Sequence, residues 1–377
     1  MNYDKLALEL HKKYKGKITT SLRDQSELDR EKLSAYYTPG VAAVSKAIAE
    51  DESLMPVYTW TNNLVAVISD GSAVLGLGNI GPKGAMPVME GKALLFKHFA
   101  KIDSVPIVLD VHTEDEIVAA VKAIAPSFGA INLEDIAAPT CFAVEERLKA
   151  ELDIPVFHDD QHGTAVVTLS GIINAMKVTG KNLADCKVVM IGAGAAGTAI
   201  TKLLHRYGVG SIVAVDSRGI ISDSRTDLND EKKVLLTYLD TSKSGTLDDA
   251  ITGADIFIGV SKPALLTPEM VKKMAKDPII FALANPTPEI MPDLAREAGA
   301  AIVATGRSDF PNQVNNAIAF PGIFRGALDN GVKKITDAHK IAAAEAIASL
   351  VENPTADEIM PSPFDERIVP TVANTIY

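Results

Sequence analysis

Two pairs of adjacent carboxylates lie near the middle of this 377-residue chain. Glu134 and Asp135 follow the apolar run GAINL, and Asp159 and Asp160 follow IPVF after one histidine. Both runs resemble buried strands, and the carboxyl ends of parallel strands meet in one crevice of an open sheet. Carboxylates gathered there repel one another unless a cation lies among them, and oxygen ligands favour Mg²⁺ or Mn²⁺. The sequence therefore predicts a divalent-metal site. The alternative is that both pairs are helix N-caps.

A glycine-rich turn follows these carboxylates. GAGAAG at 192–197 stands between the apolar run KVVMI and an amphipathic segment, and the run SIVAVD then ends at Asp216. This is the context in which a dinucleotide pyrophosphate approaches a helix N-terminus. A carboxylate at 216 favours NAD, whereas Arg218 could meet the 2′-phosphate of NADP. The predicted dinucleotide contacts are Gly192, Gly194, Ala195, Ala196, Gly197, Asp216, Arg218 and Asn285.

A second pattern of the same form, GLGNIG at 76–81, precedes a proline-rich stretch. Pro82, Gly84 and Pro87 follow it. We expect these residues to prevent a helix from beginning there, because proline lacks the backbone N–H and restricts the chain. The pattern is therefore interpreted as a tight loop that lines the crevice, not as a second dinucleotide site.

Several other side chains could react with or hold a small substrate. Lys92 is expected near the start of a helix and on its apolar face, where burial would lower its pKa and make it a usable base. A solvated lysine is the alternative. Tyr37 precedes the rigid Thr-Pro-Gly turn and either reacts or covers apolar surface. The amides of Asn285, Asn315 and Asn316 suit hydrogen bonds to a carboxylate or ordinary Asx turns.

Strand-like and helical runs alternate along most of the chain, which predicts an α/β fold with mainly parallel sheets. We expect two domains. Residues 1–160 would form an N-terminal substrate and metal domain with a helical N-terminal arm. Residues 161–377 would form a Rossmann-type, doubly wound dinucleotide-binding domain whose C-terminal helices return to the first domain. The polar segment 223–249 is expected at the surface.

The composition restricts the possible partners and surroundings. The net charge is −11 with no dense basic patch, which argues against nucleic acid as a partner. Cys141 and Cys186 are the only cysteines and are expected to be buried free thiols. The chain has no apolar stretch of about 18 residues, the length needed to span a membrane, and the N-terminus lacks a signal-peptide core. These features predict a cytoplasmic protein.

The motifs YYTPGVA, GLGNIGP, PVMEGK, NLEDI, FHDDQHGTA, GAGAAG, ANPTPE and NNAIAFPG occur in this order. Together they resemble the malic enzyme family in its short bacterial form. The resemblance implies oxidative decarboxylation of L-malate to pyruvate and CO₂ with NAD(P), and a homodimer. By similarity, a metal would be bound by Glu134, Asp135 and Asp160, and malate by Asn285 and Asn316. Lys92 would be the general base, Asp159 its partner, and Tyr37 the general acid.

One departure from the family and two competing functions stay open at this point. Larger members carry an arginine ahead of the GLG loop, where this chain has Ser72-Ala73-Val74. The alternatives are an oxaloacetate decarboxylase without net redox chemistry and an NAD-responsive binding protein without catalysis. Asp216 and the intact GAGAAG argue against the first, and Lys92 and Tyr37 against the second. In a dimer, Tyr37 of the arm could serve the neighbouring subunit, or the arm could fold back on its own domain.

Overall fold

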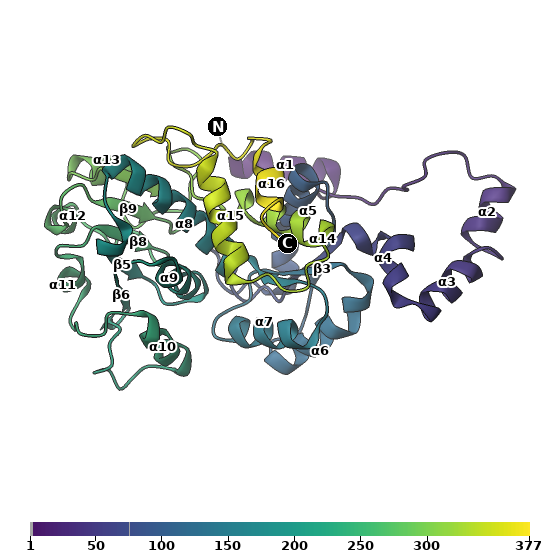
Figure 1. Ribbon diagram of the computed structural model, residues 1–377, viewed down its shortest axis with the longest axis horizontal. Coiled ribbons are helices and arrows are strands. Elements are labelled where there is room, and N and C mark those ends of the chain that lie inside the picture. Colours follow the sequence, from purple (N-terminus) through teal and green to yellow (C-terminus); the bar gives the residue numbers. More distant parts are fainter. Residues whose placement is uncertain (1–2, 75) are drawn as a thin grey trace.

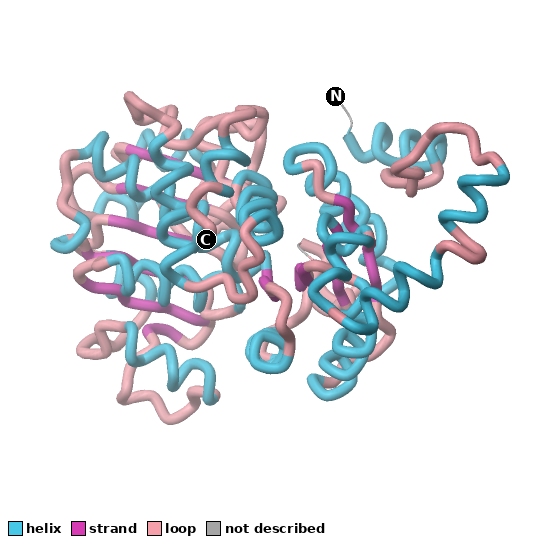
Figure 2. Tube along the Cα trace, turned by 45° about the vertical axis from the view of Figure 1, so that its right-hand side comes forward, coloured by secondary structure: helices cyan, strands magenta, loops and turns pink. Residues whose placement is uncertain are grey.

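The N-terminal arm is a string of helices that leaves the body of the molecule. The computed structural model describes residues 3–74 and 76–377. The arm helices are α1 (Tyr3–Tyr14), α2 (Arg30–Tyr36), α3 (Val41–Glu50) and α4 (Met55–Tyr58). None of the four contains a buried residue. Figures 1 and 2 show α2 and α3 projecting away from both sheets, whereas the segment after α1 is tied to α5 (Gly81–Ala100) by the hydrogen bonds of Lys17 to Glu90 and to the Pro87 carbonyl.

The first sheet is entirely parallel and buried on both faces. Its order is β2-β1-β3-β4. The strands are β1 (Leu64–Ser69), β2 (Asp103–Val108), β3 (Ala130–Leu133) and β4 (Val156–His158). The apolar run LVAVIS forms β1 because alternate residues can be buried against two layers of helices. One layer is α5 (Gly81–Ala100) with α8 (Asp159–Thr179), and the other is α6 (Glu114–Ile124) with α7 (Thr140–Glu151).

The second sheet has the Rossmann strand order, which confirms the predicted fold class. The order is β10-β9-β8-β5-β6-β7, parallel except for β7. The strands are β5 (Lys187–Ile191), β6 (Ser211–Asp216), β7 (Gly219–Ile220), β8 (Ile256–Gly259), β9 (Ile279–Ala282) and β10 (Ile302–Thr305). The helices of this half are α9 (Ala195–Tyr207), α10 (Asp230–Leu235), α11 (Leu247–Ile251), α12 (Pro268–Lys273) and α13 (Pro292–Glu297).

Long helices join the two sheets through one apolar core. Helix α8 begins at the end of β4 and packs against α9 beside the second sheet. The last helices are α14 (Phe320–Asp329), α15 (Asp337–Ser349) and α16 (Ile368–Ala373). Helix α14 packs on α5 of the first sheet, with Phe96 at 4.7 Å from the Phe320 ring and 5.1 Å from Phe324, edge to face. Helix α15 packs on α8, so the chain returns across both halves.

Two expectations about the segment after GLGNIG are wrong. Helix α5 begins at Gly81, with Pro82 in its first turn and Pro87 inside the helix. A proline is tolerated in the first turn because its missing N–H would have no partner there. Lys92 consequently lies in the middle of α5 and not near its start.

No helix within residues 3–74 and 76–377 is long and apolar enough to cross a membrane, and Cys141 and Cys186 are buried and free.

We predict that Asn174→Ala destabilises the protein without changing its fold. Asn174 is fully buried in α8, and its Nδ2 donates to the carbonyls of Ala348 at 2.9 Å and Ile359 at 3.0 Å. Alanine leaves both carbonyls buried without this donor, which costs on the order of 2–4 kcal/mol. Urea unfolding followed by circular dichroism measures the loss. An unchanged free energy of unfolding would show that the two carbonyls find other donors.

Candidate active site

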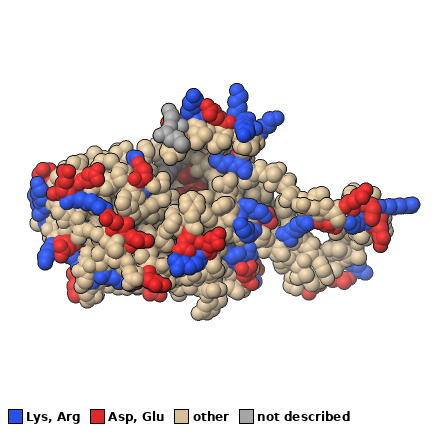
Figure 3. Space-filling model, turned by 90° about the horizontal axis from the view of Figure 1, so that it is seen from above, with Lys and Arg blue, Asp and Glu red and all other residues tan. Residues whose placement is uncertain are grey.

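The carboxyl ends of strands from both sheets face one crevice. A cavity of about 300 Å³ lies there, with walls from both halves of the chain. Its lining includes Gly76, Asp160, Thr164, Ala196, Val260, Ser261, Ala284, Asn285, Asn315 and Asn316. Seen from above, the surface is hollowed beside the arm, and acidic side chains are visible inside the hollow (Figure 3). The GLG loop contributes Gly76 to this wall, as expected for a crevice loop.

Lys92 is the centre of a buried charge cluster. Its Nζ lies 2.6 Å from Asp159 Oδ2 and 2.8 Å from Glu134 Oε1. The same ammonium group lies 4.4 Å from the centroid of the Phe320 ring. Burial alone would lower the pKa of Lys92, but the charges of Asp159 and Glu134 outweigh burial and raise it. The sequence prediction of a lowered pKa is therefore wrong, because it considered burial alone and not the charges of Asp159 and Glu134.

The carboxyl groups around Lys92 outnumber the cations. Glu134 Oε2 accepts a hydrogen bond from Asn132 Nδ2 at 2.8 Å, and Asp160 Oδ2 accepts one from the backbone N–H of Asp135 at 2.7 Å. Burial raises the pKa of Asp159 to about 7 and of Asp160 to about 6, and it raises the pKa of Glu134 as well. The site therefore holds more negative charge than Lys92 compensates.

Neither carboxylate pair serves as an ordinary helix N-cap. His158 is the N-cap of α8 and Pro139 that of α7, and neither makes a side-chain capping bond. Within the described part of the chain, no three histidine, cysteine or acidic side chains lie close enough together to hold a metal ion. Glu134 forms an ion pair with Lys92 instead. The donor set nevertheless fits a hard cation, since Glu134 and Asp135 are buried and Asp160, whose side chain is 32% exposed, lines the adjoining cavity.

A buried carboxylate on α7 holds the segment that carries Asp159 and Asp160. Glu145 accepts hydrogen bonds from the backbone N–H of His158 at 3.1 Å and from His162 Nε2 at 2.8 Å, and it pairs with Lys149 at 2.5 Å. Lys340 of α15 lies 3.0 Å from His162 Nδ1. Because lysine can only donate, the histidine proton is on Nε2. The sequence did not reveal this network, whose members stand on three helices.

The dinucleotide turn has the close packing that its glycines predicted. A Cβ on Gly197 would lie 1.7 Å from the carbonyl oxygen of Gly192, and Gly192 has a φ of +102°. Gly194 is the N-cap of α9, and Ala195 and Ala196 form its first turn. Only glycine at 197 therefore lets α9 approach the turn closely enough to present its N-terminus to a phosphate.

Asp216 is not a free carboxylate. It accepts hydrogen bonds from Arg225 at 2.8 Å, from Lys232 at 2.6 Å and from the backbone N–H of Arg218 at 2.8 Å. The hydrogen bonds outweigh burial and lower the pKa of Asp216. The Arg218 side chain instead pairs with Asp227 at 2.8 Å. Sequence analysis missed Arg225 and Lys232, which come from the charged segment expected only to be at the surface.

The three predicted amides line the cavity, whereas Tyr37 does not join them within one chain. Asn285 follows β9, and the Oδ1 atom of Asn315 accepts the backbone N–H of Ala317 at 2.9 Å while Asn316 begins the next turn. Tyr37 is the C-cap of α2 and is 69% exposed. Helix α2 stands on the projecting arm, away from β3 and α8 (Figure 1).

Two family models match almost the whole chain. The malic enzyme N-terminal domain matches residues 14–116 and 113–149, and the malic enzyme NAD-binding domain matches residues 161–370. The bifunctional malic/malolactic enzyme of Bacillus subtilis is 56% identical over 98% of this chain and 91% of its own length. The NAD-dependent malic enzyme of Geobacillus stearothermophilus is 55% identical over 96% of this chain and 76% of its own.

A solved structure agrees with this assignment. The crystal structure of the NAD-dependent malic enzyme of Thermotoga maritima has a TM-score of 0.95 and 54% identity, with 98% of each chain covered. These relatives favour a malic enzyme over the two alternatives, an oxaloacetate decarboxylase without net redox chemistry and a binding protein without catalysis. This chain belongs to the malic enzyme family, and it catalyses the oxidative decarboxylation of malate to pyruvate with reduction of NAD or NADP.

Proposed function

We propose that the crevice around Lys92 carries out this reaction on L-malate with assigned roles for its residues. Lys92 is the general base, Asp159 is its partner, and Tyr37 is the general acid. Malate is held by the amides of Asn285, Asn315 and Asn316. The observation that supports this most is the position of Lys92 between Asp159 and Glu134 beside a cavity lined by all three amides. Two buried free cysteines support a cytoplasmic enzyme.

We propose that Glu134, Asp135 and Asp160 hold Mg²⁺ or Mn²⁺. Such an ion would polarise the 2-hydroxyl and carboxylate oxygens of malate and stabilise the charge that remains after CO₂ leaves. The number of carboxyl groups here supports this assignment, since Lys92 pairs with Glu134 and Asp159 and, in the part of the chain that the structure describes, leaves Asp160 without a cation at ion-pair distance other than His158. The buried ring of His158 supports the assignment too. Its Nδ1 lies 3.7 Å from Asp160, and neither ring nitrogen has a hydrogen-bond partner within the described residues. Buried polar atoms without a partner indicate a place where an ion or water is bound.

The proposed proton transfers follow from the positions of Lys92 and Asp159. Lys92 must be uncharged to take the hydroxyl proton, so its pairing with both Glu134 and Asp159 has to weaken when substrate and metal are bound. Lys92 Nζ would then receive that proton as C2 of malate gives up a hydride to a bound nicotinamide. After loss of CO₂, the Tyr37 hydroxyl would deliver a proton to C3, and the proton held on Lys92 would pass to the Tyr37 phenolate, which restores both groups. One proton is taken from oxygen and one is given to carbon, so pyruvate forms without net acid.

The test of the metal assignment is Asp160→Asn. The amide keeps the acceptor for the Asp135 N–H but removes the charge of a proposed ligand, so Mn²⁺ should bind at least about tenfold more weakly and malate turnover should be lost. Electron paramagnetic resonance titration gives the Mn²⁺ affinity, and the rise of Tm with Mn²⁺ gives an independent measure. The control is Asp153→Asn, a carboxylate whose side chain is 92% exposed. Normal Mn²⁺ affinity in Asp160→Asn would contradict the assignment.

We propose NAD as the preferred cofactor, with NADP accepted. Asp216 at the end of β6 stands where ribose hydroxyls would be bound, and a 2′-phosphate would meet its charge. Arg225 and Lys232 offset that charge, because both pair with Asp216 within 2.8 Å. The preference for NAD is therefore expected to depend on this three-residue cluster more than on Arg218, whose guanidinium group is paired with Asp227.

Removal of the Asp216 carboxylate should move the enzyme toward NADP. In Asp216→Ser, the cations of Arg225 and Lys232 lose their partner and become available to a 2′-phosphate. We expect the ratio of kcat/KM for NADP to that for NAD to rise by about tenfold or more, which corresponds to ~1.4 kcal/mol. Steady-state kinetics with both cofactors measure the ratio, and Asp230→Ser, at a side chain that is 92% exposed, is the control. An unchanged ratio would show that Asp216 does not select the cofactor.

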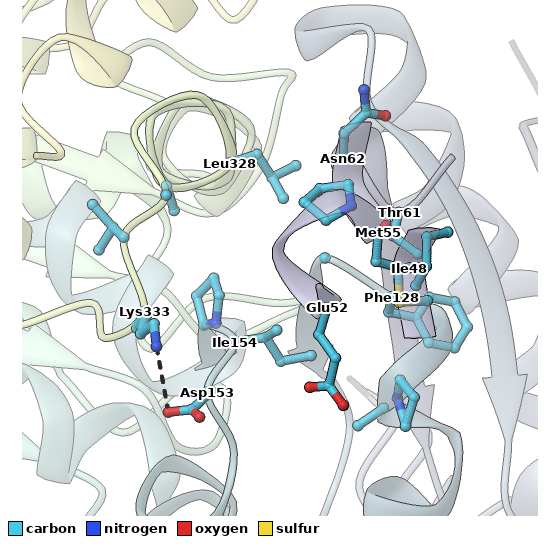
Figure 4. A pocket seen from close by; sticks show the side chains of 18 of the residues that line it. Ile48, Glu52, Met55, Thr61, Asn62, Phe128, Asp153, Ile154, Leu328 and Lys333 are labelled. Carbon is cyan, nitrogen blue, oxygen red and sulfur yellow. Dashed lines mark ion pairs between the residues drawn. The ribbon is translucent and has the colours of Figure 1, made fainter. Parts of the chain in front are cut away.

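We propose that the protein is a homodimer in which the arm packs on a second copy. Large apolar side chains are exposed along the arm, among them Leu22, Leu28, Leu33, Tyr36, Tyr37 and Val57. A mainly apolar cavity of about 760 Å³ lies between the arm residues Ile48 and Met55 and the body residues Phe128 and Leu328 (Figure 4). Several large apolar side chains exposed on one projecting segment, beside an apolar cavity, favour an interface with another chain. In this dimer Tyr37 would complete the crevice of the neighbouring subunit.

Mixing two inactive variants tests the shared site. Tyr37→Phe and Lys92→Ala each remove one proposed proton-transfer group, so each homodimer should be inactive. If Tyr37 acts in the neighbouring subunit, a mixed dimer contains one crevice with both groups intact, and malate oxidation returns to a fraction of the normal rate. Subunit exchange is verified with differently tagged chains. A mixture that exchanges subunits but stays inactive would contradict a shared site.

A further inference from the structure

Glu289 is a buried carboxylate for which the reaction scheme has no role. It lies at the end of the ANPTPE segment, between β9 and α13, and is fully buried. No lysine or arginine among the described residues forms an ion pair with it, and burial raises its pKa. A buried carboxylate without a cation is costly. A specific arrangement of hydrogen bonds must therefore compensate for its burial.

The partners of Glu289 are backbone N–H groups on two separate loops. Oε1 accepts from Ser261, which follows β8, and Oε2 accepts from Ala284, which follows β9, at 3.0 and 3.1 Å. Strands β8 and β9 are parallel neighbours. Both loops line the crevice, and Ala284 immediately precedes Asn285. One carboxylate thus joins the two loops that form this wall.

The local glycines show that the structure makes room for this carboxylate. A Cβ on Gly259, the last residue of β8, would lie 2.4 Å from Glu289 Cδ. The joined wall also abuts the dinucleotide turn, since a Cβ on Gly192 would lie 3.0 Å from the carbonyl oxygen of Val260 and 3.3 Å from Ser261 Cβ. The Ser261 loop therefore lies directly beside the first glycine of the dinucleotide turn.

We propose that Glu289 is a positioning residue for the reaction. Its carboxylate fixes the Ser261 and Asn285 loops so that malate and the nicotinamide end of the cofactor meet at one distance. The role rests on the proposed function in one respect, the assignment of Asn285 as a malate ligand. A carboxylate is required because both of its oxygens accept. In Glu289→Gln the amide NH₂ would face one of the two N–H groups, so one loop would lose its partner.

The matched control lies at the other end of the same sheet. Asp255 accepts the backbone N–H of Lys187 at 2.9 Å and pairs with Lys181 at 2.6 Å, and so joins the amino ends of β8 and β5. It is far along the strands from the crevice, which the carboxyl ends form. Asp255→Asn should therefore lower Tm and leave kcat and the malate KM unchanged. A carboxylate that only stabilises the sheet would behave in this way.

The experiment compares Glu289→Gln with Asp255→Asn in the metal-loaded enzyme. Steady-state kinetics give kcat and the malate KM, and calorimetric titration with ADP counts intact adenosine-binding sites. For Glu289→Gln we expect a higher malate KM and a roughly tenfold to hundredfold loss of kcat/KM per ADP-binding site, the size expected for one lost hydrogen bond to a charged group. The ADP affinity should fall much less than kcat/KM for malate, because ADP lacks the nicotinamide half of the cofactor and makes no contact with malate.

Two outcomes would show that Glu289 only stabilises the protein and does not position the substrate. Normal kinetics per ADP-binding site, with only a lower Tm, would overturn the proposal, as would equal losses of ADP affinity and malate turnover. If Glu289→Gln does not fold, Glu289→Asp replaces it, because the shorter carboxylate keeps two acceptors and should show the same raised malate KM to a smaller degree. Wild-type turnover is measured first, so an inactive wild-type protein would speak against the proposed function and not against the role of Glu289.

Discussion

The charge balance around Lys92 is the constraint on which the crevice depends. Glu134, Asp159 and Asp160 are brought from two strand ends into a buried space with a single ammonium group. In low-dielectric surroundings such groups cannot all ionise, so each added cation or proton changes the state of the others. The resting arrangement keeps Lys92 charged and Glu134 turned toward it. Binding of the proposed cation and of an anionic substrate would therefore also redistribute protons, and the proposed role of Lys92 as base would depend on it.

Hydrogen bonds from neighbouring helices fix the backbone segment that carries Asp159 and Asp160. Asp159 and Asp160 begin α8, and Glu145 holds that start through the N–H of His158 and the ring of His162. Through Lys340 and Asp337 the same network reaches Arg206 at the end of α9, the helix of the dinucleotide turn. The carboxylates of the first sheet and the phosphate-facing helix of the second therefore share one set of supports. Relative movement of the two sheets would have to break charged hydrogen bonds.

Sequence analysis identified the parts of the site that are encoded locally. The dinucleotide turn, the strand-terminal carboxylates and the crevice amides were all apparent, because a strand, a turn and a helix are contiguous in the chain. Most partners were not apparent from the residues themselves. The family resemblance gave Asp159 as the partner of Lys92, 67 positions away, but not the ion pair with Glu134, and the two charges together reversed the expected shift of the Lys92 pKa. Likewise, Lys232 reaches Asp216 from a segment with no regular pattern, and Glu289 gains its partners only where two strands lie side by side.

The two buried carboxylate sites of the crevice solve different physical problems. Around Lys92 the negative charge is left partly uncompensated, which makes the site responsive to a cation. Around Glu289 the charge is met by two fixed backbone N–H groups and no mobile partner, so nothing in the reaction needs to displace them. Under the proposals above, the two sites would have different tasks: the Lys92 side would exchange protons and ligands, while the Glu289 wall would keep hydride donor and acceptor at a constant distance. The two can differ in this way because the Lys92 cluster belongs to the first sheet and its helices, whereas Glu289 and its two partner loops belong to the second sheet.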